Sequence, residues 1–551
     1  MSTRWDLVVL GGGTAGIVGA KVAANFGAKV LLIEKDRPGG DCLWTGCVPS
    51  KSLLAAAHAA AVSRSSAPLG IRYPEAQVDF AAVMAHVREA ITTIEPIDSP
   101  EALNEAGVEV LSGRGVLTGA RTVQVTASAA DGDSSPGGSH DAPTSTPPVV
   151  HDISFEQLLI STGAEPAVPP IPGLADAHPL TSETVWELTE LPRRLAVLGG
   201  GSIGCELGQA FARLGAEVTI VEGESRLIPR EDERSAAILT AAMHADGVSV
   251  RTGAKVTEVK SADGAAGSDV AGGDVAGGDV DSGDVDSGPA ASDVDGETDG
   301  AVDGGVDGAV GGGVGGGSGR LVLDDGSDVE FDRVLVAVGR RPRTEGIGLD
   351  AAGVDTDERG MIVVDDLLRT SNDRIFAAGD LTGHPQFTHL AGVHGSTAAS
   401  NAVLGTRRKV ATVVPRVTFT DPEVAAVGAS TQEVEADRHL VVIEHTEVDR
   451  AVAEGRTEGF SAIVHDKSGT ILGATIVGPR AGETLGELTL AVTKGLKTRD
   501  LAGVMHPYPT FNDGPWKAAL ADVSRRLDSE PAAGAIGILS ATRRKWLSLR
   551  R

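Results

Sequence analysis

Cysteine is scarce in this chain, with three residues among 551. So low a count excludes a small secreted domain held together by disulfide bonds and indicates a reducing compartment. Long apolar runs are also missing, since no stretch reaches the roughly 18 residues that a membrane-spanning helix needs. The apolar run before Gly11 is too short for a signal peptide. From these absences we expect a soluble, cytoplasmic protein.

Positive charge is in short supply as well. The formal net charge is -28 at pH 7, which argues against nucleic acid as a partner. Residues 261–319 hold thirteen of the acids and no Lys or Arg. This stretch cannot bury enough apolar surface to offset its ordering entropy, so we expect a disordered insert; a calcium-binding repeat would need a nonapeptide pattern that is absent. It interrupts two strand-like runs and is expected at a hairpin tip, and a shorter loop insert is expected at 128–149.

The chain nevertheless contains two similar glycine-rich turns, each in a strand–turn–helix–strand setting. The first follows the apolar run 5–10, and the next strand ends in an acid. Its members are Gly11, Gly13 and Gly16, in G-x-G-x-x-G spacing, and Glu34. Glycines let the turn close and the backbone approach a pyrophosphate, the helix N-terminus binds the phosphate, and the acid holds a ribose hydroxyl. The pattern predicts a dinucleotide site.

The second turn follows the run 194–199 and predicts another such site. Its members are Gly199, Gly201 and Gly204, with Glu222 at the end of the next strand. Two units predict two dinucleotides, most simply a flavin and a nicotinamide. Glu222 favours NAD, because a carboxylate accepts the ribose 2′-hydroxyl and repels a 2′-phosphate. Arg226 and Arg230 lie just beyond, which leaves NADP open.

Between the two units lies GGDCLWTGCVPSK, residues 39–51, in which four residues separate Cys42 from Cys47. A helix-like segment follows, so Cys47 is expected at a helix start, where free N–H groups and the helix dipole favour a thiolate. Pro49 is tolerated in such a first turn. Two thiols this close can form a strained, easily reduced disulfide. A structural disulfide and a half-built metal site are the alternatives, but Cys205 is the only other cysteine, and we expect no metal.

In this order the motifs resemble the pyridine nucleotide-disulfide oxidoreductases, the class I flavoproteins that include dihydrolipoamide dehydrogenase, glutathione reductase and mercuric reductase. Further stretches with family resemblance are 161–173, 334–342, Gly379-Asp380 and 414–428. The resemblance implies an α/β fold with two Rossmann-like domains, for FAD and NAD(P), and a C-terminal α+β dimerisation domain. The expected parts are an FAD domain at 1–165 and 341–407, an NAD(P) domain at 166–340, a dimerisation domain at 408–524 and a basic tail at 525–551.

The resemblance also implies a path for electrons. NADH or NADPH would pass hydride to FAD, and the reduced flavin would reduce a Cys42–Cys47 disulfide. Cys47 would be the thiolate nearer the flavin, and Cys42 the thiol that exchanges with the acceptor. Lys51 is carried over as the lysine that stabilises negative charge on the flavin, and Glu206 as its partner. The other residues carried over are Gly40, Thr162, Gly163, Gly379 and Asp380 for FAD and Gly339 for NAD(P).

One stretch, HPYPTFND, departs from the family pattern. Dihydrolipoamide dehydrogenase and glutathione reductase carry a histidine there, hydrogen-bonded to a glutamate, that serves as a base across the dimer. With Pro509 fixing the register, Tyr508 takes the histidine position and Asp513 the glutamate position. His506 lies two residues earlier. A tyrosine with a reference pKa near 10 is about three units, or roughly 4 kcal/mol, too weakly ionised to act as a base at neutral pH.

This departure leaves the acceptor open. The leading expectation is a homodimeric NAD(P)H-dependent flavoprotein that reduces a disulfide or a related acceptor. Quinone or dye reduction, or hydride transfer between nicotinamides, is a second expectation, although soluble transhydrogenases lack the full cysteine pair. Mercuric reductase carries a C-terminal cysteine pair that this chain lacks, and a non-catalytic redox sensor is the third alternative. The tail, with Arg543, Arg544, Lys545, Arg550 and Arg551, is expected to be solvated rather than bound to a membrane.

Overall fold

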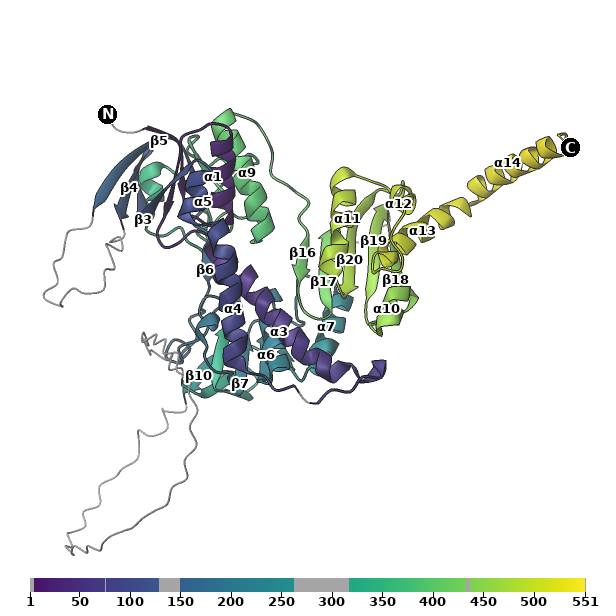
Figure 1. Ribbon diagram of the computed structural model, residues 1–551, viewed down its shortest axis with the longest axis horizontal. Coiled ribbons are helices and arrows are strands. Elements are labelled where there is room, and N and C mark those ends of the chain that lie inside the picture. Colours follow the sequence, from purple (N-terminus) through teal and green to yellow (C-terminus); the bar gives the residue numbers. More distant parts are fainter. Residues whose placement is uncertain (1–3, 75, 128–148, 262–316, 433–436, 551) are drawn as a thin grey trace, which may run out of the picture.

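The described residues form two α/β units, each built around parallel strands, followed by an antiparallel C-terminal sheet (Figure 1). The structure, a computed structural model, describes residues 4–74, 76–127, 149–261, 317–432 and 437–550. The inserts expected at 128–149 and 261–319, with the disorder expected for the longer one, lie almost wholly outside these residues. The arrangement of two Rossmann-like units and a C-terminal domain confirms the expected fold class.

The first unit is organised around β1 (Arg4–Leu10), which lies between β2 (Val30–Glu34) and β5 (Val150–Ile160) and pairs in parallel with both. Its residues from Leu7 to Leu10 are all buried, as expected of a strand covered on both faces. Beyond β5 lies β15 (Ile375–Ala377), so residues far along the chain complete this sheet. The other strands of the sheet are β3 (Val108–Gly119) and β4 (Thr122–Ala127).

Helix α1 (Thr14–Asn25) lies along α9 (Thr388–Leu404), and small residues permit the close contact (Figure 1). A Cβ at Gly395 would lie 2.1 Å from the carbonyl oxygen of Ala15. Any larger side chain there would force the two helices apart. The contact therefore fixes α9 against the first glycine-rich turn.

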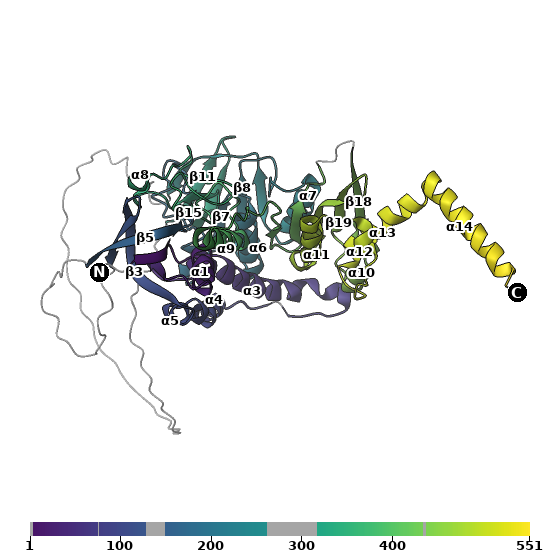
Figure 2. The same ribbon diagram turned by 90° about the horizontal axis from the view of Figure 1, so that it is seen from above.

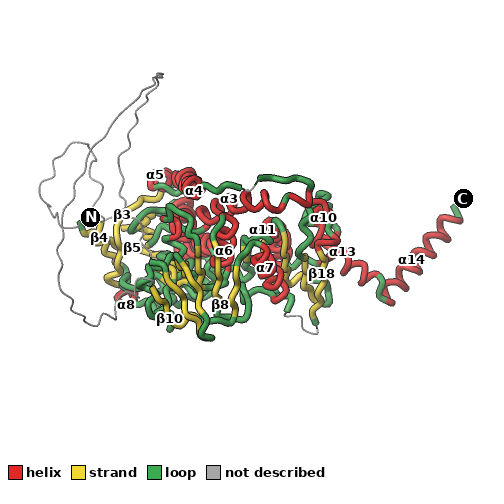
Figure 3. Tube along the Cα trace, turned by 90° about the horizontal axis from the view of Figure 1, so that it is seen from below, coloured by secondary structure: helices red, strands yellow, loops and turns green. Residues whose placement is uncertain are grey.

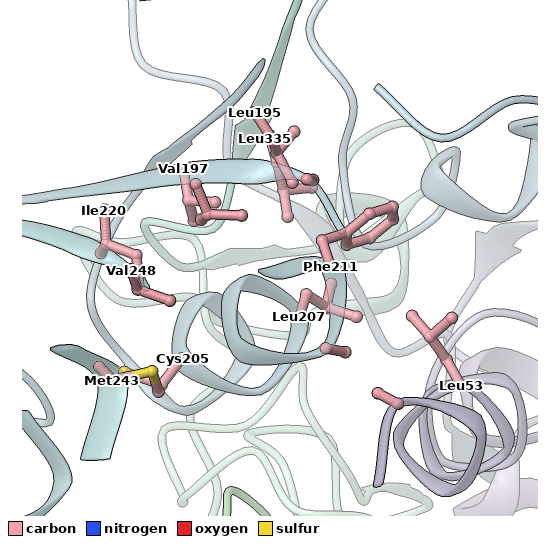
Figure 4. Close-up of a cluster of buried hydrophobic side chains, with 14 of the residues drawn as sticks. Leu53, Leu195, Val197, Cys205, Leu207, Phe211, Ile220, Met243, Val248 and Leu335 are labelled. Atoms are coloured by element: carbon pink, nitrogen blue, oxygen red, sulfur yellow. The ribbon is translucent and has the colours of Figure 1, made fainter. Parts of the chain in front are cut away.

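The second unit repeats this plan with four parallel strands in the order β13-β7-β8-β9. Their bounds are β7 (Arg194–Leu198), β8 (Glu217–Glu222), β9 (Ser249–Thr252) and β13 (Arg333–Val336). Figure 4 shows how α6 (Ser202–Leu214) directs Leu207 and Phe211 into the apolar cluster beside these strands. Leu53 of α3 (Cys47–Ser65) joins the same cluster. The helix that begins at Cys47 is thereby anchored to the second unit.

An antiparallel hairpin flanks the longer insert. Strand β10 (Val256–Ser261) pairs with β11 (Gly319–Leu323), and Ser261 lies opposite Gly319. Strand β12 (Asp328–Phe331) pairs with β11 on its other side. The hairpin expected around the insert is therefore confirmed at its base.

The C-terminal domain is an antiparallel sheet in the order β16-β17-β20-β19-β18. Its elements are β16 (Arg416–Thr418), β17 (Glu423–Gly428), β18 (Arg438–Glu444), β19 (Phe460–Asp466), β20 (Ile471–Gly478), α10 (Asp449–Glu454), α11 (Ala481–Lys494), α12 (Thr498–Ala502) and α13 (Asp513–Leu527). The basic tail is a helix, α14 (Glu530–Ser548), that projects away from the rest of the chain in each view (Figures 1, 2 and 3). Within the described ranges no helix is long and apolar enough to cross a membrane.

Further helices and strands belong to the two α/β units and the crossings between them. They are α2 (Gly40–Trp44), α4 (Phe80–Ile94), α5 (Pro100–Glu105), α7 (Glu233–Ala245), α8 (Leu349–Ala352), β6 (Ala164–Pro166) and β14 (Arg340–Pro342). Strands β6 and β14 pair with each other at the two chain crossings between the units. Arg340, the first residue of β14, also pairs with Asp41 of α2, the helix that carries Cys42.

Candidate redox site and dinucleotide cradles

The first glycine-rich turn is tied to the acid at the end of the next strand. Gly11 adopts φ +106°, and a Cβ at Gly16 would lie only 1.9 Å from the carbonyl oxygen of Gly11. The Gly12 N–H donates to Glu34 Oε2 at 2.5 Å, and the Asp36 N–H donates to Glu34 Oε1 at 2.9 Å. These bonds fix a carboxylate beside the turn, in the position expected to accept a ribose hydroxyl.

The second turn has almost the same geometry. Gly199 adopts φ +104°, and a Cβ at Gly204 would again lie 1.9 Å from a carbonyl oxygen, that of Gly199. Glu222 accepts from the Gly200 N–H at 2.6 Å and from the Glu224 N–H at 2.8 Å. The two turns therefore present the same cradle twice.

Two arginines follow Glu222, and one of them is already engaged. The Arg226 guanidinium donates to the carbonyl oxygens of Pro229 at 3.1 Å and Glu231 at 3.3 Å. It is held within its own loop rather than extended toward the turn, whereas Arg230 is exposed. The carboxylate of Glu222 is thus the charged group fixed next to the second turn.

A cavity of about 450 Å³ opens at the N-terminus of α1 and has the features of a flavin dinucleotide site. Gly13 caps the helix without a side-chain hydrogen bond, so the first N–H groups of α1 are free to bind a phosphate. Glu34 lines one part of the cavity, and Cys42 and Thr388 line another. A Cβ at Gly11 would lie 2.5 Å from the Ser161 carbonyl oxygen, and one at Gly16 would lie 1.9 Å from that of Gly11, so larger side chains would distort the turn that shapes the cavity. The residues present therefore fit FAD.

The other residues carried over to the flavin site line the same cavity. They are Gly40, Thr162, Gly163, Gly379 and Asp380. Burial raises the pKa of the Asp380 carboxyl, and the nearby Arg340, whose Nε lies 3.5 Å from Asp380 Oδ2, opposes this effect. Gly339 lies elsewhere, on the chain crossing after β13, where its carbonyl oxygen accepts from the Ala167 N–H at 2.9 Å.

The cysteine loop is bound directly to the first turn. The Gly39 N–H donates to the Gly12 carbonyl oxygen at 2.9 Å. Gly40 has φ +58°, and a Cβ there would lie 2.6 Å from the Cα of Gly13. Only glycine permits this approach. The loop then continues into α2, which carries Cys42.

Cys47 is the first residue of α3, which confirms the predicted helix start. Both Cys42 and Cys47 are free thiols in the structure. The Cys42 thiol donates a hydrogen bond to Cys47, and this bond, helped by Thr388 and the positive charge of Lys51, lowers the pKa of Cys47 to about 6. The Cys47 sulfur lies 3.3 Å from Thr388 Oγ1. The same bond to Cys47 raises the pKa of Cys42, so the geometry favours a Cys47 thiolate beside a Cys42 thiol.

Lys51 lies one turn along α3 from Cys47 and faces the second unit. Its Nζ lies 2.8 Å from Glu206 Oε2, and this carboxylate is buried. Glu206 Oε1 accepts from the Phe419 N–H at 2.9 Å, and the Lys51 ammonium sits 4.2 Å from the centre of the Phe419 ring. Three separate parts of the chain thus meet at the lysine.

The stretch around Tyr508 is arranged differently from the family pattern of a base and its acid. The Tyr508 hydroxyl donates to Asp449, and this bond raises the pKa of Tyr508 further. Asp513 is buried in the first turn of α13 and lies 3.5 Å from the Thr510 N–H. His506 pairs instead with Glu487 at 3.0 Å. The structure therefore joins Tyr508 to Asp449, a residue that the sequence did not indicate.

Cys205, the third cysteine, does not contribute to either site. It is a fully buried residue of α6 (Figure 4) and donates to the Gly200 carbonyl oxygen at 3.3 Å, and burial raises the pKa of its thiol. In the described part of the chain, no group of three or more His, Cys, Asp or Glu side chains is arranged to hold a metal ion.

Several residues of the site were not assigned a role from the sequence. Thr388, Phe419 and Arg340 reach the cysteines, Glu206 and Asp380 from positions far along the chain. A threonine eight residues after Asp380 carries no signal by itself. Only the fold brings these residues together.

The sequence matches the family described as pyridine nucleotide-disulphide oxidoreductase over residues 5–291 and 303–395, and the dimerisation domain of that family over residues 414–519. It is 32% identical over 529 residues to a mercuric reductase from Bacillus cereus, covering 95% of this chain and 72% of that protein. A mercuric reductase from Streptomyces lividans is 33% identical over 92% of this chain and 94% of its own length. A dihydrolipoyl dehydrogenase from Chlamydia muridarum is 31% identical over 96% of this chain and 99% of its own length.

Solved structures show the same fold. LpdA from Mycobacterium tuberculosis is 25% identical, with a TM-score of 0.74 over 96% of this chain and 100% of that one. RclA from Escherichia coli, an HOCl-induced flavoprotein disulfide reductase, is 24% identical, with a TM-score of 0.71 over 93% of this chain and 98% of that one.

Proposed function

The chain belongs to the pyridine nucleotide-disulphide oxidoreductase family, and within it we propose that electrons pass from NADH through FAD to the Cys42–Cys47 pair and on to a disulfide or related acceptor. Enzymes of this class use FAD and NAD(P)H. The observation that carries the proposal is the setting of Cys47, a helix-start cysteine with a lowered pKa that is hydrogen-bonded to Cys42 and Thr388, two residues that line the cavity that fits FAD.

FAD, when bound, supplies the two-electron carrier between the nicotinamide and the cysteine pair. In our proposal, Gly11, Gly13 and the free N–H groups of α1 bind its pyrophosphate, and Glu34 holds its adenine-side ribose. Lys51 contributes a positive charge near the cysteine pair, and Glu206 keeps that charge in place. Cys47 holds the thiolate and Cys42 the proton.

Exchange with a disulfide acceptor then follows from the positions of the two sulfurs. Cys42 loses its proton and attacks one acceptor sulfur, which forms a mixed disulfide and releases the first thiol with that proton. The Cys47 thiolate attacks the Cys42 sulfur, the internal disulfide forms again, and the second thiol leaves after taking a proton from water. One dithiol is oxidised and one acceptor disulfide is reduced. Tyr508, with its raised pKa, is a poor base for the first step.

We further propose that NADH is preferred to NADPH. Glu222 is fixed at the second turn by two backbone N–H groups, where its charge would repel a 2′-phosphate. Arg226 is occupied by the carbonyl oxygens of Pro229 and Glu231 and is not free to bind that phosphate. The C-terminal sheet matches a dimerisation domain, which supports a homodimer.

A second candidate acceptor is a thiophilic metal ion such as mercuric ion. The long matches to mercuric reductases favour it, as does the tyrosine in place of the histidine base. Against it, the only cysteine outside the pair is Cys205, which is buried. A metal ion would therefore have to be taken up directly by Cys42 and Cys47.

Turnover with a panel of acceptors tests the proposal. We expect NADH-dependent reduction of at least one disulfide or of mercuric ion by the wild type, and loss of about 100-fold or more of this activity in Cys42→Ser, because the exchanging thiol is gone. Reduction of a quinone, which takes electrons from the flavin directly, should continue in Cys42→Ser. Cys205→Ala is the matched control and should keep every activity. Equal disulfide turnover in Cys42→Ser and the wild type would contradict the proposal.

A further inference from the structure

Gln209 lies on α6, one turn after Glu206, and its buried amide binds the backbone of a single residue in the C-terminal domain. It is 1% exposed. Gln209 Oε1 accepts from the Asp421 N–H at 2.8 Å, and Gln209 Nε2 donates to the Asp421 carbonyl oxygen at 2.8 Å. The same Nε2 donates to Asp246 Oδ2 at 2.8 Å. Because the amide donates at one end and accepts at the other, only one orientation of its side chain satisfies these partners.

The segment held in this way also carries the hydrogen bond to Glu206. Phe419, two residues before Asp421, donates its N–H to Glu206 Oε1 at 2.9 Å and places its ring 4.2 Å from the Lys51 ammonium. Glu206 in turn pairs with Lys51 at 2.8 Å. The path from Gln209 to Lys51 is therefore a continuous set of short contacts. It passes through residues 419–421, which enter the site from a different domain than α3 and α6.

We propose that Gln209 is a positioning residue: by clamping the Asp421 backbone it holds the Phe419 N–H on Glu206, and so holds Lys51 beside Cys47. This inference rests on the proposed function, since it assigns Gln209 a role in the same cysteine site. Gln209 touches neither the cavity that fits FAD nor the cysteines, and its effect passes through Glu206.

Arg213 provides a matched contrast on the same helix. It binds the Asp421 side chain, with Nη1 3.0 Å from Oδ2, and it binds Asp246 at 2.8 Å. Arg456 also pairs with Asp421. The Arg213 pair attaches the Asp421 side chain to α6, whereas Arg456 lies in the C-terminal domain itself, and both leave the backbone groups of Asp421 to Gln209. Weakening them should loosen the domain contact without releasing the Asp421 N–H and carbonyl.

Loss of the clamp has a defined expected consequence. In Gln209→Met the Asp421 N–H and carbonyl oxygen are buried without partners, so the segment must move to find water. The Phe419 N–H then leaves Glu206, and Lys51 loses its fixed partner. Since the charge of Lys51 helps to lower the pKa of Cys47, the midpoint at which the Cys47 thiolate forms should rise.

The test is a pH titration of the two-electron-reduced holoenzyme, following the long-wavelength absorbance of the Cys47 thiolate against the flavin. Gln209→Met should raise the midpoint by about 0.5 to 1 unit and lower kcat about tenfold with little change in KM for NADH. Gln209→Glu keeps an acceptor for the Asp421 N–H, but its second oxygen would face the Asp421 carbonyl oxygen and the Asp246 carboxylate, so it should shift the midpoint in the same direction. Arg213→Lys should leave the pH midpoint unshifted and kcat within about twofold of the wild type.

A double-mutant cycle separates positioning from general damage. In a Glu206→Gln background, Gln209→Met should add little further shift, because its effect passes through Glu206. An unshifted midpoint in both Gln209 variants, or fully additive effects in the cycle, would overturn the positioning role. A wild type with no thiolate absorbance at any pH would instead contradict the proposed function itself, so the two failures are distinguishable.

Discussion

The two dinucleotide units share one turn geometry but differ in the helix that follows the turn. Each turn binds its carboxylate through the N–H of the middle glycine, Gly12 to Glu34 and Gly200 to Glu222. Helix α1 buries only small and apolar residues, which let it lie against α9. Helix α6 buries Glu206 among its polar residues and directs it at Lys51.

This difference shows how one supersecondary unit serves two purposes. The first unit is a cradle whose helix surface is kept small so that α9 can approach. The second unit has the same cradle, and in addition its helix carries polar side chains that join α3 to the C-terminal domain. In our proposal the glycine-rich turn is where a dinucleotide binds, while the helix that follows the turn determines which other parts of the chain the unit contacts.

The same substitution in both turns should separate the two roles most strongly. In Gly16→Ala and Gly204→Ala the new Cβ meets a carbonyl oxygen at 1.9 Å, so each turn must open. We expect Gly16→Ala to lose bound flavin at least about tenfold, and Gly204→Ala to keep its flavin but lose NADH-driven reduction. The ratio of flavin to protein absorbance and the rate of flavin bleaching by NADH check this. Loss of flavin in Gly204→Ala but not in Gly16→Ala would contradict the assignment of the first turn to the flavin and the second to NADH.

Removal of the carboxylates of Glu34 and Glu222 should also separate flavin binding from NADH use, with a smaller effect than the glycine substitutions. Glu222→Ala removes a charge-assisted hydrogen bond to the ribose and the repulsion of a 2′-phosphate. We expect kcat/KM for NADH to fall about tenfold, which corresponds to roughly 1.4 kcal/mol. The value of kcat/KM for NADPH should fall less. Glu34→Ala is the matched variant and should weaken flavin retention instead. A wild type that prefers NADPH would contradict the role given to Glu222.

The lysine next to the cysteines should set the pH range of the thiolate. Cys47 has its pKa lowered to about 6, so its thiolate persists at neutral pH and is lost as the pH falls through about 6. Lys51→Met removes a positive charge that lowers the pKa of Cys47. We therefore expect the pH midpoint of thiolate formation to move upward by about one unit. Lys29→Met, a lysine over the Trp5 ring, is the control and should not move it. A downward shift in Lys51→Met would be inconsistent with the site.

The tail should matter least. Helix α14 follows α13 and projects away from the rest of the chain (Figures 1 and 2). Deletion of residues 529–551 should leave the flavin content and NADH turnover within about twofold of the full chain, because changes to surface segments away from a site usually have little effect. Flotation of both forms with anionic vesicles checks the expectation that the tail is solvated. A turnover that collapses on deletion would show that the tail reaches the site.

Short sequence patterns predicted most of the local structure around the site. The glycine turns, the acids at the strand ends and the helix start at Cys47 depend on short spacings, because a turn, a helix and a strand form one connected unit. The hairpin around the longer insert could be predicted for the same reason. These features need no knowledge of which distant segments meet.

The contacts that complete the site are of another kind. Thr388 lies 341 positions from Cys47, and Phe419 lies 213 positions from Glu206. Such side-chain and backbone contacts produce no periodicity in the sequence, since only one residue on each segment takes part. The same applies to Asp449, which binds Tyr508 where the family pattern indicated Asp513. Resemblance supplied the pairing of Lys51 with Glu206, but no pattern indicated Gln209.

The most direct test of the electron path is to count thiols during reduction. The oxidised holoenzyme is titrated anaerobically with NADH, alkylated, and the peptide that carries Cys42 and Cys47 is weighed by mass spectrometry. The proposed path predicts that both cysteines become alkylated after the first equivalent of NADH per flavin, while Cys205 stays unmodified in the folded protein. A pair that remains an intact disulfide while NADH is consumed would contradict it.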